Sequence, residues 1–171
     1  TSHAEFDVLI PDIECDKQVG ADLDNDGDLE VPYVENLELP CDTLFPFTLE
    51  YRFTVTNTGE TPLLNVQICD PELVADARAA GLIVGPCALC NDPACDGTGD
   101  TCAPLPALAV GAPPATATCR IRVPSRAAWE AFAARDTDGR PNHYSNVSTA
   151  MANVNAAAIC DRPALWTQAN Q

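Results

Sequence analysis

The chain has 171 residues, of which 25 are acidic and 9 are basic, and its formal net charge at pH 7 is −16. This charge disfavours nucleic acid and anionic membranes and favours cations, and no stretch approaches the roughly 18 apolar residues that span a membrane. A chain of this length can also bury a core without a partner. We therefore expect one domain over residues 1–171 that binds no nucleic acid and does not insert into a membrane.

Cysteine is unusually frequent, with nine residues. In an acidic, strand-rich protein this frequency indicates disulfide bonds that form outside the cytosol. Lys17 is the only lysine, whereas arginine, alanine and proline are frequent, a bias typical of prokaryotes with GC-rich genomes. We therefore expect a secreted prokaryotic protein that is extracellular or lies at the cell surface. The spacing leaves the pairing open among the disulfide candidates Cys15, Cys41, Cys69, Cys87, Cys90, Cys95, Cys102, Cys119 and Cys160.

The first predicted strand lies near the N-terminus. Its alternating apolar pattern begins at Phe6, is interrupted by Pro11 and resumes at Ile13. Because proline cannot donate the backbone hydrogen bond of a central strand, the pattern predicts an edge strand or a break between two strand segments. One interpretation places this strand at the edge of the chain's own sheet. The other makes residues 1–14 an N-terminal arm, with residues 4–10 as a strand that completes the sheet of a neighbouring copy.

Residues 20–36 form an acidic loop that carries the most specific chemical pattern in the chain. Carboxylates stand at alternate positions, and Gly27 permits the sharp turn of a calcium-binding loop. Asp28 would bind the calcium ion through its backbone carbonyl, and Glu30 would bind it directly or through water. The predicted calcium ligands are Asp22, Asp24, Asp26, Asp28 and Glu30.

The match to an EF-hand loop is incomplete. The twelfth position holds Tyr33 rather than glutamate, so the bidentate ligand must come from Glu35 or from a distant acid. No helices are predicted on either side of the loop. A solvated acidic turn is the alternative, but five carboxylates in the nine residues 22–30 repel one another unless a cation offsets their charge. We therefore expect calcium as the cofactor, bound in an isolated loop like those of extracellular modules.

The clearest strand pattern lies in the segment that follows. Residues 47–55 alternate between apolar and polar side chains, which is the period of a strand with one buried and one solvated face. Residues 57–60 contain asparagine and glycine and predict a turn. A second strand then alternates in the same way, and its inward residues are expected to be Leu64, Val66 and Ile68.

Residues 49–70 resemble the repeat domain of bacterial and archaeal surface proteins that is catalogued as domain of unknown function eleven. The positions of its motif are occupied by Tyr51, Val55, Asn57, Gly59, Leu63 or Leu64, Asn65, Val66, Ile68 and Asp70. Residues 143–154 and 156–166 resemble the closing segments of that family. The resemblance implies an immunoglobulin-like, antiparallel β-sandwich without a catalytic site. We therefore expect an all-β fold with short helical insertions and a disulfide-stapled loop.

Two short helices are expected as the insertions. The first, residues 71–82, starts with a proline, has Asp70 as its N-cap and stops at Gly81. The second, residues 125–135, has Ser125 as its N-cap. Its core-facing residues are expected to be Trp129, Phe132 and Ala133.

Residues 85–104 form a cysteine-rich loop. Cys87 and Cys90 have the spacing of a zinc site, but the later spacings do not repeat it and no histidine lies nearby. Frequent proline, glycine and aspartate favour a loop held by disulfides, with zinc or an iron–sulfur cluster as the alternatives. A second candidate cation site in this loop comprises Asp92, Asp96 and Asp100.

A further strand is predicted over residues 115–123, with Cys119 on its inward face. Cys69 lies on the opposite face of its own strand from Val66 and Ile68. The two parities therefore argue against a bridge between Cys69 and Cys119.

Little in the sequence indicates catalysis. His143 lies near Ser145, but no nucleophile elbow or partner acid accompanies them. Asn146 begins a glycosylation sequon, which matters only if the host glycosylates and is otherwise the entry to a strand. We therefore expect that the protein is not an enzyme.

An extracellular structural subunit is the expected function, one that self-assembles at the surface or in a filament and is stabilised by calcium and disulfides. Its expected partners are other copies, through the N-terminal strand, and other surface proteins. If eight cysteines pair internally, the ninth is free to bond to another subunit. The alternative is a calcium-dependent adhesive or ligand-binding module of a larger surface protein. The third class is an enzyme, either a calcium-dependent hydrolase or a redox protein that uses Cys87 and Cys90.

Overall fold

The computed structural model describes residues 9–90, 95, 102–136, 144, 146, 148–154 and 165–170, and for residues 154 and 165–170 it describes the backbone alone. Strands predominate, as the sequence predicts, and two short helices accompany them. The elements are β1 (Ile13–Asp22), β2 (Val31–Val34), β3 (Phe47–Asn57), β4 (Leu63–Cys69), α1 (Pro71–Ala79), β5 (Ile83–Cys87), β6 (Cys102–Pro104), β7 (Ala115–Val123), α2 (Arg126–Ala133), β8 (Ser148–Val154) and β9 (Leu165–Asn170).

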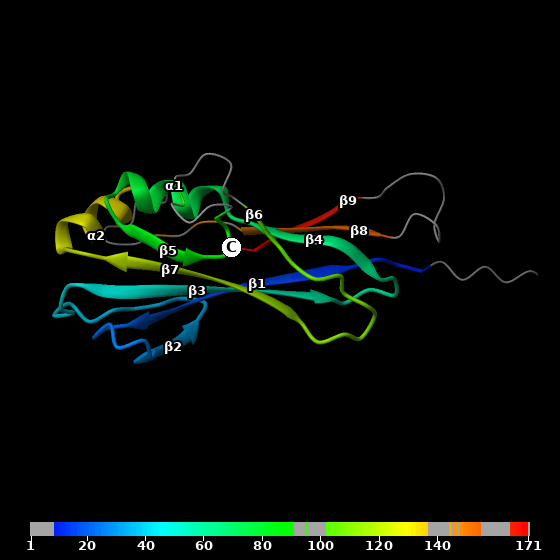
Figure 1. Ribbon diagram of the computed structural model, residues 1–171, viewed down its shortest axis with the longest axis horizontal. Coiled ribbons are helices and arrows are strands. Elements are labelled where there is room, and N and C mark those ends of the chain that lie inside the picture. The colour runs from blue at the N-terminus through cyan, green and yellow to red at the C-terminus, as the bar shows by residue number, and fades with distance from the viewer. Residues whose placement is uncertain are drawn as a thin grey trace, which may run out of the picture.

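The strands form two antiparallel sheets stacked as two layers (Figure 1). Sheet A contains five strands in the order β2-β1-β3-β7-β5, and sheet B contains four in the order β6-β4-β8-β9. Buried apolar residues from both sheets and both helices form one hydrophobic cluster. The prediction of a sandwich-like β protein with short helical insertions is therefore confirmed.

The middle strand of sheet A, β3, organises this core. It pairs along nearly its whole length with β1 on one side and β7 on the other. Its side chains alternate strictly between buried and half-buried positions from Phe47 to Asn57, as predicted. Because β7 has the same alternation, with Cys119 and Ile121 fully buried, the two strands present a continuous apolar face to sheet B.

In β4 the predicted alternation is wrong at its start. Leu64 is 37% exposed, whereas Leu63 is fully buried together with Val66 and Ile68. The cause is a register shift between Leu64 and Gln67 in the pairing with β8, where Asn65 has a positive φ of 50°. Such a bulge inserts one residue into the strand and reverses which neighbours face the core.

The N-terminal segment also differs from the prediction. The described strand starts at Ile13, so residues 13 and 14 belong to β1 rather than to an arm, and residues 1–8 lie outside the described part of the chain. β1 is not a simple edge strand, because β2 covers it near Val19 and Ala21. Pro11 precedes the strand and is buried.

The turn between β3 and β4 holds the segment before β1 in place. Ile10 and Glu60 exchange hydrogen bonds, from the Glu60 amide to the Ile10 carbonyl at 2.8 Å and from the Ile10 amide to the Glu60 carboxylate at 3.2 Å. A Cβ atom on Gly59 would lie 2.2 Å from the Asp12 amide nitrogen. Glycine is therefore required where the two segments cross.

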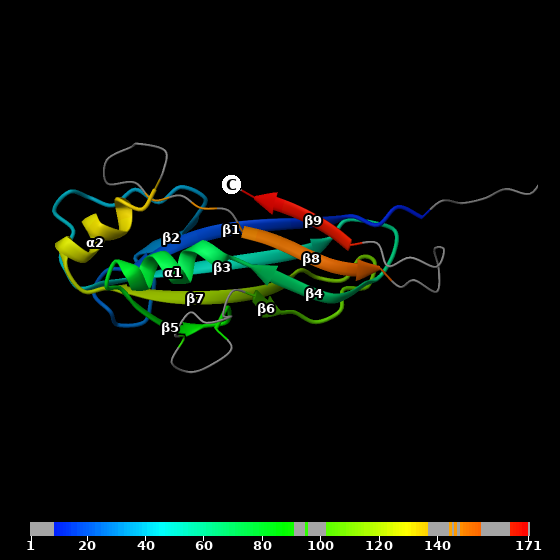
Figure 2. The ribbon, with the colours of Figure 1, turned by 90° about the horizontal axis from the view of Figure 1, so that it is seen from above.

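Both predicted helices are present, with the expected N-caps. The side chain of Asp70 accepts from the Leu73 amide at 3.0 Å, and the side chain of Ser125 accepts from the Ala128 amide at 3.3 Å. Figures 1 and 2 show α1 continuing the layer of β4 over sheet A, with α2 beyond it. Phe132 of α2 is fully buried, so the helices cover the end of sheet A that sheet B leaves open.

Among the described residues, none of the helices has the length and apolar character that a membrane span requires.

We predict that Phe53→Ala lowers the free energy of unfolding by about 3–5 kcal/mol, because it leaves a cavity in the core. Phe53 is fully buried. Its neighbour Thr54 points to the other face of β3, so Thr54→Ala is the matched control and should cost less than about 1 kcal/mol. Urea unfolding of the oxidised protein measures both. Equal losses for the two variants would contradict the assigned orientation of β3.

Candidate metal centre

The predicted acidic loop connects the two strands of a β-hairpin. β1 runs to Asp22 and β2 starts at Val31, so the loop proper is residues 23–30 and is shorter than the predicted range 20–36. The strands pair antiparallel, with Ala21 opposite Val31. Strands rather than helices therefore flank the loop, consistent with the expectation that it is not part of an EF-hand.

The backbone of the loop winds around its own carboxylates. The Asp26 amide donates to Asp24 Oδ1 at 3.1 Å, and the Asp28 amide donates to Asp26 Oδ1 at 2.9 Å. The Gly27 amide donates to Asp22 Oδ2 at 3.1 Å. Gly27 has a φ of 105°, a conformation that side chains disfavour. The glycine of the sequence pattern is thus needed for the turn.

Contacts with β3 and β7 anchor the loop to sheet A. Asn25 donates from Nδ2 to the Pro46 carbonyl at 2.7 Å and accepts from the Thr48 hydroxyl at 2.7 Å. A guanidinium nitrogen of Arg120 donates to the Gly27 carbonyl at 3.2 Å. The loop therefore has a defined position on the sheet rather than being a free solvated turn.

Four carboxylates converge in this loop. One oxygen atom from each carboxylate lies within 4.8 Å of an oxygen atom of each of the others. The Leu23 amide donates a hydrogen bond to Oε2 of Glu30, one of these four residues, at 2.5 Å. The group consists of Asp22, Asp24, Asp26 and Glu30.

Asp22 is the buried member of the group, at 3% exposure. Its Oδ2 atom lies 3.8 Å from a guanidinium nitrogen of Arg120, but its Oδ1 atom is buried and has no hydrogen-bond partner. A buried oxygen without a donor is costly. The residues therefore fit a hard cation, which binds several carboxylate oxygens at once.

The electrostatics of the loop agree with this fit. The hydrogen bond from the Asp26 amide lowers the pKa of the Asp24 carboxyl, but desolvation and the charges of its acidic neighbours outweigh it, so the pKa is raised. A raised pKa means that the neighbours disfavour the ionised form. A bound cation would reverse this effect because it attracts each of the carboxylates.

The remaining predicted contributors lie outside the converging group. The carboxylate of Asp28 does not belong to the converging group. The predicted contribution of Asp28 is its backbone carbonyl, which does not require the carboxylate to converge. Tyr33, at the twelfth position, donates its hydroxyl to Glu50. Glu50 in turn accepts from Arg120 Nε at 2.5 Å. Glu35 was predicted as a source of the bidentate ligand, but it does not belong to the converging group either.

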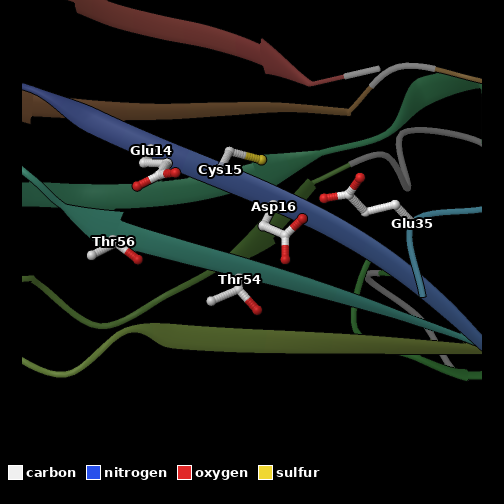
Figure 3. A pocket seen from close by; sticks show the side chains of 6 residues that line it. All are labelled: Glu14, Cys15, Asp16, Glu35, Thr54 and Thr56. Atoms are coloured by element: carbon white, nitrogen blue, oxygen red, sulfur yellow. The ribbon is translucent and has the colours of Figure 1, made fainter. Parts of the chain in front are cut away.

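Glu35 instead lines a hollow on the outer face of sheet A (Figure 3). The hollow has a volume of about 510 Å³ and is also lined by Glu14, Asp16, Thr54 and Thr56. Its three acids do not gather within 4.8 Å as those of the loop do; within the described ranges only the loop brings carboxylates together so closely. The hollow is therefore acidic but is a poorer cation site than the loop.

The cysteines in the described part of the chain form three disulfides, which confirms the predicted disulfide-stapled loop. Cys69–Cys102 joins β4 to β6, and Cys87–Cys119 joins β5 to β7. Cys90–Cys95 closes the cysteine-rich loop on itself. Although the sulfur atoms of Cys87, Cys90 and Cys95 lie within 4.8 Å of one another, each is already in a disulfide, so no thiolate is left for zinc. Cys69 and Cys119 are not bonded to each other, as predicted.

Two described cysteines are free, Cys15 and Cys41. Cys15 is buried between the sheets, with its sulfur 3.9 Å from the Ser148 hydroxyl oxygen, and Cys41 is exposed. The following predicted residues lie outside the described part of the chain: Asp92, Asp96, Asp100, His143, Ser145 and Cys160.

No protein-family model, no curated protein and no solved structure matches the chain. The similarity of residues 49–70 to domain of unknown function eleven therefore stays a prediction. What can be said of function comes from the residues of the chain itself.

We predict that alkylation without reduction labels Cys41 in the native protein and Cys15 only after denaturation. Cys41 is exposed, whereas burial raises the pKa of the Cys15 thiol and so disfavours its reactive thiolate. The bridged cysteines should react only after reduction. Peptide mapping with iodoacetamide measures this, and Cys41→Ser is the control that should remove the native label. Labelling of Cys87, Cys90 or Cys95 before reduction, or stoichiometric zinc, would contradict the assignment.

Proposed function

We propose that this chain is an extracellular structural module of a cell surface or filament, held rigid by disulfides and stabilised by calcium in the β1–β2 loop. The observation that carries the proposal is the buried Oδ1 atom of Asp22, which has no hydrogen-bond partner and belongs to one of four converging carboxylates. We propose no catalytic role. Calcium there would tie the hairpin to the rest of sheet A.

Calcium suits the loop better than other cations. The converging ligands are carboxylate oxygens, with neither imidazole nor thiolate among them, and oxygen-only sites select calcium or magnesium. Calcium accepts the flexible and irregular geometry of a loop more readily than magnesium does. Asp22, Asp24, Asp26 and Glu30 would bind through their side chains and Asp28 through its carbonyl.

The order of the strands favours an immunoglobulin-like topology. In immunoglobulin domains the first, second, fifth and fourth strands form one sheet in the order A-B-E-D, and strands C, F and G form the other. Here β1, β3, β7 and β5 lie in the order expected of A, B, E and D, while β4, β8 and β9 lie in that of C, F and G. We infer that β2 and β6 are additions to this pattern. This topology agrees with the family that residues 49–70 resemble.

Three disulfides indicate that the protein matures in an oxidising environment. We propose the surface of a secreting prokaryote as the place. The biased composition that motivates this proposal includes a single lysine, Lys17.

Self-association through the N-terminus is the second part of the proposal. Residues 1–8 precede the contact between Ile10 and Glu60 that fixes the chain to its own turn. We propose that they add as a strand to the sheet of a neighbouring copy. A strand added in this way makes a head-to-tail contact, which continues into a filament unless the rotation closes. The net charge of −16 opposes close approach of copies, and bound calcium would reduce that repulsion.

We predict that calcium raises the melting temperature. At a calcium concentration about 100 times Kd the folded state gains about 2.7 kcal/mol, which for a chain of this size corresponds to a rise of roughly 5–10 °C. Differential scanning calorimetry in chelator and in calcium measures the rise. The double variant Asp24→Asn, Asp26→Asn should lose most of it.

The matched control for that experiment is Asp42→Asn, Glu38→Gln. These two acids are also exposed and lie outside the carboxylate group, so the control removes the same charge and should keep the calcium response. Identical melting curves of the wild type with and without calcium would end the calcium proposal. A response lost equally in both double variants would show a general charge effect instead.

We predict that deletion of residues 1–8 converts calcium-dependent assemblies to monomers. The deletion keeps the hydrogen bonds between Ile10 and Glu60, so the domain itself should melt at the same temperature. Sedimentation velocity in calcium measures the assembly. If the full chain is monomeric there, the adhesive-module alternative is favoured and self-assembly is rejected. If both proteins assemble alike, the N-terminal route is wrong.

A further inference from the structure

Three polar side chains from both layers meet between the sheets. Lys17 stands at an inward position of β1 in sheet A, next in that row to the buried Cys15. Asp70 lies between the end of β4 in sheet B and the start of α1. Asn146 comes two residues before β8. Lys17 is the chain's only lysine, and the fold places it inside.

The contacts among these three side chains are direct. Lys17 Nζ donates to Asp70 Oδ2 at 2.8 Å and also to Asn146 Oδ1. Asn146 Nδ2 donates to Asp70 Oδ1 at 2.5 Å. The two oxygens of one carboxylate therefore hold an amine on one side and a carboxamide nitrogen on the other, and the amine lies against the carboxamide group itself.

Lys17 and Asp70 are shielded from water, and Asn146 is half-buried. The side chain of Asp70 is 0% exposed and that of Lys17 is 9% exposed. The Lys17 ammonium lies 5.2 Å from the centre of the Tyr51 ring and 5.8 Å from that of Phe53. Burial lowers the pKa of Lys17, and the Asp70 charge only partly offsets this. A desolvated lysine with a depressed pKa more readily loses its proton and becomes a nucleophile.

We propose that Lys17 and Asn146 form an intramolecular isopeptide bond between Nζ and Cγ, and that Asp70 carries the protons for this reaction. A buried ion pair alone explains the contact of Lys17 with Asp70. It does not explain why the carboxamide of Asn146 is held against the amine by the same carboxylate.

The reaction balances without any co-reactant. Asp70 Oδ2 accepts a proton from the Lys17 ammonium, and the free amine attacks Asn146 Cγ. The Nζ–Cγ bond forms and the Cγ–Nδ2 bond breaks. Two protons pass in total from Nζ to Nδ2 through the carboxylate, so that Nδ2 leaves as ammonium and Asp70 is returned unchanged. No atom is oxidised or reduced, and the positions already held by hydrogen bonds provide the proximity that the step needs.

The bond would have a distinct place in the fold. Among the described residues each disulfide lies within one sheet or one loop: Cys69–Cys102 in sheet B, Cys87–Cys119 in sheet A, and Cys90–Cys95 in the cysteine-rich loop. A Lys17–Asn146 bond would join residues 129 positions apart and would tie sheet A to the chain entering β8 of sheet B. The contact of Asn146 Nδ2 with the fully buried Asp70 also argues against a glycan on this asparagine.

The first measurement is the intact mass of the full-length protein after complete reduction and denaturation. We expect a mass lower than that of the sequence by one ammonia molecule. A mass equal to that of the sequence would overturn the proposal. A deficit alone does not establish it, because an asparagine that closes on its own backbone to a succinimide also loses ammonia.

A tryptic map of the reduced and alkylated protein decides between these products. Trypsin does not cut at a modified lysine or before proline, so the bond should join residues 1–52 to residues 136–171 in one branched peptide. Without the bond, trypsin releases residues 1–17. Release of that peptide in full yield, whatever the intact mass, would overturn the proposal.

Variants test the role of each group. Lys17→Arg keeps the charge, and Asp70→Asn keeps a side-chain acceptor for the α1 N-cap, yet both should have the full sequence mass and no branched peptide. Asn36→Ala, which changes an exposed asparagine elsewhere, should retain the bond. Persistence of the branched peptide in Asp70→Asn would overturn the role of Asp70. If a variant fails to fold, the map of the wild-type protein still decides whether the bond exists.

Discussion

Burial of one face of β3 sets the register of sheet A and the side chains that face the core. The strand lies in the middle of sheet A and places an unbroken row of apolar side chains toward sheet B. Burying such residues is worth roughly 1.5–3 kcal/mol each, so a slip of one residue would expose the row and is strongly disfavoured. The pairing with β1 and β7 then fixes which of their residues point inward, including Lys17 and Cys119.

The pairing of β1 with β3 also places a polar side chain, that of Lys17, inside the protein. Lys17 occupies an inward position because β1 must pair in register with β3, and a buried ammonium requires a partner of opposite charge. Asp70 supplies it while also capping α1. One carboxylate thus orients a helix, neutralises a buried amine and holds Asn146, so its position links the two sheets more specifically than apolar packing does.

The sequence predicted the carboxylates of the acidic loop but not the contacts that anchor the loop to the sheet. Alternate carboxylates and Gly27 predicted a turn that gathers oxygen ligands, and four of the five predicted residues converge by their side chains. The loop is local in sequence, so its chemistry was visible there. The anchoring of the loop was not visible, because Arg120 lies 93 residues beyond Gly27 and meets it only through the pairing of β3 with β7. Glu35, which follows β2, lies outside the carboxylate group and lines the hollow beside β1 instead.

Features that depend on near neighbours could be predicted from the amino-acid sequence. The period of two in β3 and β7, the helix caps at Asp70 and Ser125 and the acidic turn each follow from residues a few positions apart. The contacts between distant residues could not be predicted in this way. They include the disulfide partners 32 and 33 positions apart and the contact of Lys17 with Asn146. The bulge at Asn65, which brings Leu63 rather than Leu64 into the core, also depends on the partner strand β8. Strand order and register arise from the stacking of two complete sheets, and no short stretch of sequence carries that information.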